Sequence, residues 1–289
     1  VGLGTCGISA GASKTYDELN TKLKDMGLDI PLLETGCMGM CYREPIVEIH
    51  TKSGKNFIYG NITPEKVDKV FQSHIIDNEP FEKWIVQGPK AKEDDSFFNK
   101  QTKIVLRNCG KLDPDSLDQY IENNGYKALE KAIKEHSRED IIKIITDSGL
   151  RGRGGAGFPT GLKWKFAKQA EGDKKYIVCN ADEGDPGAFM DRSILEGDPH
   201  SVMEGMMIAG YAIGSDEGYI YVRAEYPQAI ERLKKAIKDA EENGFAGENI
   251  LGTDFNFKFR IKEGAGAFVC GEETALIASI EGERGMPRF

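Results

Sequence analysis

The chain has 289 residues, of which 39% are hydrophobic and 29% are charged, and its formal net charge is −9. These values are typical of a globular protein of about two domains. The negative charge argues against a nucleic acid or an anionic membrane surface as a partner, because both favour a basic protein face. No apolar run approaches the roughly 20 residues that span a bilayer. No signal peptide is visible, although an original N-terminus could precede Val1.

Residues 1–73 are expected to form a small α/β domain. The expected elements are a helix capped by Ser13 and closed by Gly27, a hairpin of 46–50 and 57–59 that turns at Ser53-Gly54, and a helix that starts at Thr63-Pro64. Residues 74–102 show no clean period and contain a charged run, so we expect a linker there.

Residues 103–289 are expected to form a second domain, which begins at the apolar run 104–107 and alternates helices with strands. The expected helices are 113–125, 127–136, 138–147, 199–213 and 227–243, and the expected strands are 176–179, 219–223 and the alternating run 255–261. Ser137 and Asp140 resemble a capping box. The order of elements indicates an α/β fold for the whole chain.

Residues 149–161 carry six glycines, which let backbone N–H groups approach a ligand and form an anion-binding nest. Pro159 suits the first turn of a helix, whose N-terminus favours a phosphate. Arg151, Arg153 and Lys163 add positive charge to an acidic protein. The rival interpretation is a flexible loop without a ligand.

Gly152, Gly154 and Gly157 satisfy the pattern G-x-G-x-x-G, which is a weak signal by itself. A Rossmann fingerprint needs a preceding strand and an acidic residue about 20 positions later. Here residues 140–148 read as a helix, and residues 171–175 read as a turn. We therefore expect a nucleotide-phosphate cradle, but not an ordinary Rossmann site.

Two further segments carry polar side chains beside small residues. After the strand at 176–179 come Asn180, Asp182, Glu183 and Asp185, whose amide and carboxylates can bind hydroxyls, ring nitrogens or an amide. Residues 263–276 combine small residues with Phe268, Glu272 and Glu273. The alternatives are an acidic turn that caps the next helix and a buried, glycine-rich helix start.

Together the three segments resemble the flavoprotein subunit of respiratory complex I and its relatives in NAD-linked hydrogenases and formate dehydrogenases. The family motif R-G-R-G-G-A-G-F-P-T-G-x-K-W is found at 151–164, C-N-A-D-E-x-x-P-G at 179–187, and G-A-G-x-x-x-C-G-E-E-T-A-L at 264–276. The resemblance runs from Ile104 to Phe289. It implies a Rossmann-like FMN-binding α/β domain of the complex I flavoprotein type.

The resemblance also implies which residues bind the cofactors. FMN would lie against Gly152, Gly154 and Gly155 with its phosphate at Lys163, and its polar edge and ribityl chain would contact Asn180, Asp182 and Glu183. The site would be closed by Phe268, Gly271, Glu272 and Glu273, with Glu273 reaching NADH as well. The NADH adenine would lie between Phe158 and Phe166, and Asp185 stands where relatives often carry glutamate.

The implied chemistry is hydride transfer between NAD(H) and FMN, followed by single-electron transfer to iron–sulfur centres. It requires no nucleophile, metal ligand or general base from the protein, so the four histidines are expected at the surface or in packing. The family normally continues beyond Phe289 with cysteines for a [4Fe–4S] cluster, so we expect a truncated subunit. Cys109, Cys179 and Cys270 are then read as structural.

The front domain resembles the thioredoxin-like ferredoxin domain that some relatives carry, which holds a [2Fe–2S] cluster on a C-x4-C pair and a C-x3-C pair. Cys37 and Cys41 supply the second pair. Cys6 is either the second member of the first pair, with Val1 at the partner's place, or the first member, with Gly11 there.

Only three thiolates are therefore present for this cluster, at Cys6, Cys37 and Cys41. Two interpretations stay open, a [2Fe–2S] cluster and a ligand-poor relic used for docking. Zinc with His50 as fourth ligand is a weaker alternative, because His50 is expected on a strand.

A fused front domain favours a cytoplasmic hydrogenase or formate dehydrogenase over complex I, and the widely spaced cysteines suit a reducing cytoplasm. Residues 4–12 look most like the β subunit of NAD-dependent, electron-bifurcating [FeFe]-hydrogenases. The expected partners are an iron–sulfur catalytic subunit and a small thioredoxin-like [2Fe–2S] subunit, without nucleic acid or membrane insertion. The rival function is a ferredoxin-type carrier or docking subunit, which would not reduce viologen dyes from NADH.

Overall fold

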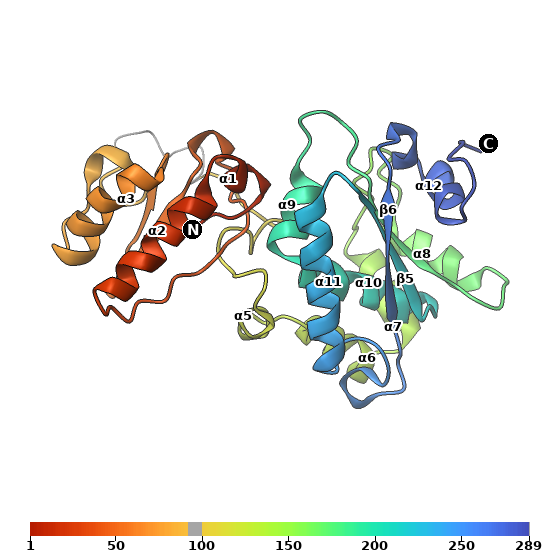
Figure 1. Ribbon diagram of the computed structural model, residues 1–289. Helices are drawn as coiled ribbons and strands as arrows, with labels where there is room; N and C mark the ends of the chain where they lie inside the picture. Colours follow the sequence, from red (N-terminus) through yellow and green to blue (C-terminus); the bar gives the residue numbers. More distant parts are fainter. Residues whose placement is uncertain (92–99, 289) are drawn as a thin grey trace. The chain divides into compact units, whose positions relative to one another are not determined.

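The computed structural model describes residues 1–91 and 100–288, which form a mixed α/β protein (Figure 1). The chain divides into two compact units. The first comprises Val1–Pro114 with Glu196–Asp198, and the second comprises Asp115–Leu195 with Pro199–Phe289.

The sheet of the first unit has three antiparallel strands in the order β1-β2-β3: β1 (Val47–His50), β2 (Asn56–Tyr59) and β3 (Ile85–Gln87). The predicted hairpin is confirmed, because β1 pairs with β2 across a turn that Thr51 and Lys55 close with a backbone hydrogen bond. Gly54 in this turn has φ +78°, a value that glycine adopts without strain.

The helical segments of the first unit are α1 (Thr5–Ser9), α2 (Ala12–Asp25), η1 (Cys41–Arg43), α3 (Pro64–Val70), η2 (Phe71–Ile76) and η3 (Glu82–Trp84). The N-cap of α2 is Gly11 and not Ser13, because the chain enters this helix through a left-handed residue with φ +97°. Thr63 is the N-cap of α3 with proline in the first turn, as predicted.

The core of the first unit joins one face of α2 to β2 and α3. It contains Leu19, Leu23, Tyr59 and Val67, which are all buried. The Tyr59 hydroxyl lies 2.7 Å from Nδ1 of the buried His74, so this histidine is a packing residue.

The segment 74–102 is not simply a linker. Ile85 of β3 is buried and pairs with Tyr59 of β2, and a three-residue strand is too short to show a period in the sequence. The charged run extends into residues 92–99, which lie outside the described residues. Residues 103–114 cluster with the first unit, whereas we expected the second domain to begin at 103.

The second unit is built on three parallel strands in the order β4-β5-β6: β4 (Ile177–Ala181), β5 (Glu217–Arg223) and β6 (Lys258–Gly264). Its helical segments are α5 (Leu117–Glu122), α6 (Lys127–Glu135), α7 (Arg138–Asp147), α8 (Thr160–Gln169), α9 (Met190–Gly197), α10 (Pro199–Ile213), α11 (Pro227–Glu242), η4 (Ile250–Gly252), η5 (Phe268–Gly271) and α12 (Glu273–Ile280). Helix α10 packs against β4, β5 and α8 (Figure 1).

Most element predictions for this unit are confirmed. Ser137 and Asp140 form the expected capping box at the start of α7. A helix rather than a strand precedes the glycine-rich loop, as an atypical nucleotide site requires. The start of α5 is a correction, because the helix begins after its N-cap Ser116 and not at residue 113, and the Ser116 side chain accepts a hydrogen bond from the Gln119 N–H.

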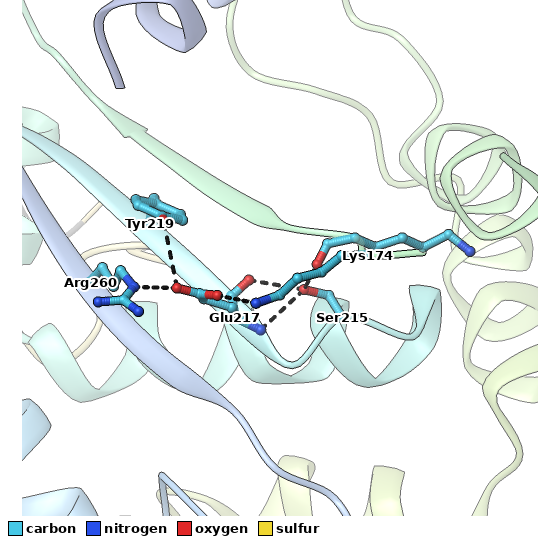
Figure 2. A network of polar contacts seen from close by, with 6 residues as sticks. Lys174, Ser215, Glu217, Tyr219 and Arg260 are labelled. Carbon is cyan, nitrogen blue, oxygen red and sulfur yellow. Dashed lines mark hydrogen bonds and ion pairs between the residues drawn. The ribbon is translucent and has the colours of Figure 1, made fainter. Parts of the chain in front are cut away.

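An ion-pair network ties together the amino-terminal ends of the three parallel strands, as Figure 2 shows. Glu217 at the start of β5 is buried and accepts from Arg260 on β6 and from Lys174, which precedes β4, at 2.5 Å. These two cations lower the pKa of Glu217 to about 2. The Ser215 hydroxyl lies 2.9 Å from the Glu217 carbonyl oxygen and supports the same turn. The network links the three strands at the edge opposite to the functional motifs.

Candidate functional site

The second and third motifs follow the carboxyl ends of two parallel strands. Strand β4 ends at Ala181 and β6 at Gly264, so these motifs leave the sheet at the same edge. Strand β5 ends between them at Arg223. Open parallel sheets bind ligands at this edge, because the loops there are free to carry polar groups.

Direct contacts join the second motif to the third. The Asn180 side-chain amide donates a 2.9 Å hydrogen bond to the Gly271 carbonyl oxygen. Gly184 lies against the ring of Phe268, and a Cβ at this glycine would be 2.8 Å from a ring carbon. The structure therefore brings these two segments together and requires a residue without a side chain at position 184.

Asp182 has an unused acceptor in this region. Its Oδ2 is buried and makes no hydrogen bond within the described residues. Burial raises the pKa of Asp182, and Arg223 opposes this effect by its positive charge. A buried acceptor without a donor is costly, so this oxygen is suited to an N–H group of a ligand.

Glu183 turns its carboxylate towards the start of helix α9. Its two oxygens accept from the backbone N–H groups of Asp191 at 3.0 Å and Arg192 at 3.2 Å. The Tyr226 hydroxyl lies 3.3 Å from the same carboxylate, and Arg223 donates to the Glu183 carbonyl oxygen at 2.7 Å. Glu183 thus holds the loop after β4 to α9 and to the loop after β5.

Glu272 binds backbone N–H groups of its own segment, because it is the N-cap of α12. Its carboxylate accepts from the hydroxyl of Thr274 and from the N–H groups of Thr274 and Ala275, and these bonds lower its pKa. Glu273 and Phe268 are also exposed, with 69% of Phe268 accessible. Asp185 is exposed as well. These three side chains can reach a ligand without a change in the fold.

The glycine-rich loop is closed at its base. The Gly152 N–H donates to the Phe158 carbonyl oxygen at 2.9 Å, and the Thr160 N–H donates to that of Leu150 at 2.9 Å. Gly155 has φ +104° within the loop, a conformation that favours glycine. The loop is therefore a defined turn between α7 and α8, which argues against the flexible-loop interpretation.

The glycines of this loop differ in whether a side chain would fit at their positions. A Cβ at Gly154 would meet no atom within 4 Å, and Gly152 is almost as open. A Cβ at Gly161 would lie 2.7 Å from Cα of Thr146, so this glycine allows α8 to pack on α7. The open positions leave backbone exposed to a ligand, while Gly161 serves the fold.

Exposed side chains surround this loop. Phe158 is 46% exposed and Phe166 on α8 is 54% exposed, although large aromatic side chains are usually buried. Lys163 on α8 is exposed as well. Helix α8 packs on α10, which also packs on β4, so the first motif is linked through α10 to the strand that carries the second.

The sequence reasoning missed the contribution of the loop after β5. Arg223 and Tyr226 hold the Glu183 backbone, and Glu225 lies beside Gly266 of the third motif. The signal was present, since polar residues follow an apolar strand here just as they do after β4.

Three thiols come together in the first unit. Sγ of Cys37 lies 3.6 Å from Sγ of Cys41, and the Cys6 side chain forms a hydrogen bond with Cys41. Burial, followed by the Cys37 charge, raises the pKa of Cys41 to about 12. Gly39 with φ +95° shapes the loop and donates its N–H to Cys37 Sγ at 3.3 Å.

These thiols do not form a ready site for a single metal ion. Among residues 1–91 and 100–288, no group of three or more His, Cys, Asp or Glu side chains is arranged to hold one. His50, the expected fourth zinc ligand, lies 3.3 Å from Glu48 and is largely exposed. The geometry therefore gives no support to the zinc alternative.

Residues 145–289 match the family of the Nuo51 FMN-binding domain. The chain belongs to this family. The sequence is 61% identical over 188 residues to the NADP-reducing hydrogenase subunit HndC of Solidesulfovibrio fructosivorans, which covers 65% of this chain and 38% of that protein. It is 53% identical over 186 residues to an NADH-quinone oxidoreductase subunit of Aquifex aeolicus, covering 64% of this chain and 43% of that one.

A solved structure resembles this chain over almost its whole length. The crystal structure of NAD+-reducing [NiFe]-hydrogenase in the H2-reduced state matches with a TM-score of 0.53 and 27% identity, over 99% of this chain and 46% of that chain. The chain spans about two fifths of the length of the curated relatives it matches. Within the described residues, no helix is long and apolar enough to cross a membrane.

Proposed function

We propose that this chain is the NAD(H)- and FMN-binding part of a flavin oxidoreductase subunit in a multi-subunit hydrogenase. Membership of the Nuo51 FMN-binding family supports the flavin, and the hydrogenase relatives support the type of complex. The observation that carries the proposal is the contact of two family motifs, through Asn180 and Gly271, beside the buried acceptor of Asp182. Formate dehydrogenase and complex I remain the alternative settings for the same role.

The residues present fit FMN. The carboxylate oxygen Oδ2 of Asp182 is a buried acceptor for a ring N–H group, and the open backbone at Gly152 and Gly154 leaves room for a flat ring or a phosphate. Lys163 at the start of α8 supplies a cation for the phosphate. When bound, FMN accepts a hydride and passes on single electrons.

We divide the side chains of the motifs into those that contact the flavin and those that hold the loops around it. Asn180, Glu183 and Glu272 hold loops and helix ends, so we assign them to the shape of the flavin site. Asp182, Phe268 and Gly271 face the ligand in this proposal. Gly155 gives the glycine-rich loop its turn.

We assign the nicotinamide nucleotide to the exposed side of the site. Phe158 and Phe166 offer two accessible aromatic faces, which suit the adenine ring. Glu273 and Asp185 are exposed carboxylates that can accept from ribose hydroxyls. These assignments follow the family motifs, and exposure of all four side chains supports them.

The first unit is assigned to electron transfer or docking. Its antiparallel sheet with flanking helices supports the thioredoxin-like interpretation, and Cys6, Cys37 and Cys41 are thiol donors of the type that iron–sulfur clusters use. We propose an iron–sulfur catalytic subunit and a small [2Fe–2S] subunit as partners. A [4Fe–4S] centre would belong to the family region beyond residue 289. Six cysteines without a disulfide suit a cytoplasmic location.

Gly154→Val tests the flavin assignment in the full-length protein. The backbone at this position is compatible with a side chain, and a Cβ meets no atom within 4 Å, so the variant should fold. We expect it to lose bound FMN, because the valine side chain would occupy ligand space. Flavin absorbance after gel filtration measures the loss.

The matched control is Gly205→Ala, which also places a Cβ in open space, on helix α10. It should keep its flavin. Full FMN occupancy in Gly154→Val would overturn the assignment of this loop. NADH-dependent reduction of a viologen dye by the wild type distinguishes the flavin enzyme from a carrier or docking subunit, which would show none.

A further inference from the structure

The three thiols that come together in the first unit differ in how far solvent reaches them. Cys41 is exposed, Cys6 is partly buried, and Cys37 is buried with 8% of its surface accessible. Cys41 is also the one exposed cysteine of the six, all of which lie within the described residues. A small reagent in solution therefore reaches Cys41 before any other thiol of the chain.

Cys37 lies where it can react with a sulfur that has been modified at Cys41. The two Sγ atoms are 3.6 Å apart, so a disulfide of about 2.05 Å is within reach of two side chains that already touch. Gly39, with φ +95°, allows the turn that returns the chain from Cys37 to Cys41. The Gly39 N–H donates to the Cys37 sulfur at 3.3 Å and holds it on the inner side of this turn.

The arrangement of these thiols favours oxidation over metal binding. Among residues 1–91 and 100–288, no group of His, Cys, Asp or Glu side chains is arranged to hold a metal ion. An accessible thiol with a second thiol in contact is the usual arrangement of a cysteine that is oxidised reversibly to a disulfide. In a reducing compartment such a bond is transient and serves in catalysis or in redox sensing.

The surroundings of Cys41 distinguish between these two uses. Although the residue is exposed, desolvation of its sulfur, followed by the Cys37 charge, raises the pKa of Cys41 to about 12. Because the thiolate is the form that attacks a disulfide, exchange at this site is slow near neutral pH. A slow reaction suits a site that responds to sustained oxidation better than one that turns over a substrate.

We propose that Cys37 and Cys41 form a reversible dithiol–disulfide pair, a modification site for low-molecular-weight disulfides such as glutathione disulfide. First, Cys41 gives its proton to solvent, and its sulfur attacks the small disulfide to form a mixed disulfide and release one small thiolate. Then Cys37 gives up its proton, and its sulfur attacks Cys41 Sγ, which closes the internal bond and releases the second small thiolate. Each released thiolate takes up a proton. The protein thus loses two electrons and two protons, and the small disulfide gains them.

Cys6 is outside the pair in this proposal, although it forms a hydrogen bond with Cys41. A bond between Cys37 and Cys41 closes only the short loop 37–41, so the two sulfurs keep a high effective concentration when the chain moves. Cys6 reaches Cys41 from a separate segment and lacks this advantage. The inference does not depend on the flavin, because the flavin motifs lie in the second unit.

The test uses the whole chain, which is reduced with dithiothreitol, desalted without oxygen and incubated for hours with glutathione disulfide. Remaining thiols are then blocked with iodoacetamide, and the peptides are analysed by mass spectrometry. We expect a disulfide between Cys37 and Cys41 in the wild type, without retained glutathione, and dithiothreitol should reverse it. The matched control Cys6→Ser removes the third thiol of the group and should give the same product.

A double variant identifies the thiol that is attacked first. Cys6→Ser combined with Cys37→Ser leaves Cys41 without a neighbouring thiol, so this variant should retain glutathione on Cys41. Its absence there would contradict the first step.

The wild-type product alone identifies the pair, so the test stands even where a variant fails to fold. Stable glutathione on wild-type Cys41, a bond between Cys6 and Cys41, or no reaction at all would overturn the proposal. Iron bound by these thiols in the isolated chain would overturn it as well. Bound FMN, measured in the same samples, reports on the second unit separately.

Discussion

At the scale of single residues, the proposed role of Asp182 makes ligand binding depend on pH. Burial raises the pKa of its carboxyl group in the chain without a ligand. A ligand N–H bound to Oδ2 favours the charged form and lowers that pKa again. The affinity for FMN should therefore be full above the pKa of the ligand-free chain and fall as the pH drops through it.

Asp182→Asn replaces this charged acceptor with a neutral amide. We expect the Kd for FMN to rise about 10- to 100-fold, because a hydrogen bond to a charged group contributes roughly 1.5–3 kcal/mol. The variant should also lose the fall in affinity at low pH. Flavin fluorescence titrations across pH 4–8 measure both effects. Asp173→Asn, an exposed carboxylate in the turn before β4, is the control, and equal behaviour of the two variants would contradict the role of Asp182.

At the scale of elements, the Glu217 network links the starts of the parallel strands. Two cations depress the pKa of Glu217 to about 2 from its usual 4.5. The contribution of Glu217 to the stability of the folded chain is therefore complete above pH 4.5. It is lost as the pH falls from there towards 2. Glu217→Gln should lower the free energy of unfolding by about 1–3 kcal/mol at pH 7, since Lys174 and Arg260 lose a shared partner.

Urea unfolding at pH 7 and at pH 2.5 measures this effect. The difference between wild type and variant should shrink at the lower pH, where the wild-type carboxylate is partly protonated. Glu242→Gln breaks an exposed ion pair with Lys238 and should change stability by less than about 0.5 kcal/mol. A difference that stays the same at both pH values would show that the network does not act through charge.

At the scale of the whole molecule, each unit carries one of the two tryptophans, which makes their unfolding separately visible. Trp84 packs on Phe81 in the first unit, and Trp164 packs near Ile142 in the second. FMN at 100 times its Kd should stabilise the second unit by about 2.7 kcal/mol. The proposed site lies in the second unit, so the first unit should unfold at an unchanged denaturant concentration.

The measurement uses Trp84→Phe to observe the second unit and Trp164→Phe to observe the first. FMN should shift the urea midpoint seen in the former variant and leave that of the latter in place. Riboflavin, which lacks the phosphate, should shift it less. An equal shift of both transitions would mean that the units unfold together.

The sequence by itself determined those features that depend on neighbours along the chain. The capping box of Ser137 and Asp140, the hairpin around Gly54 and the proline at the start of α3 are set by local hydrogen bonds and backbone preferences. The family motifs were also readable, because the glycines and carboxylates of a binding loop stand close together in the sequence. Membership of the Nuo51 FMN-binding family agrees with that interpretation.

Only the tertiary structure decided which groups meet across long separations. Strand β3 is stable through its pairing with β2, and three residues carry no period that a sequence pattern could reveal. Asp182 keeps an unused buried oxygen, whereas Glu183 directs its carboxylate to α9, although the two are adjacent in one motif. Gly110 packs closely on Met38, which is far from it in the sequence, because a glycine there leaves room for the Met38 side chain. Burial and partner choice depend on the packing of distant segments, and no local pattern records that packing.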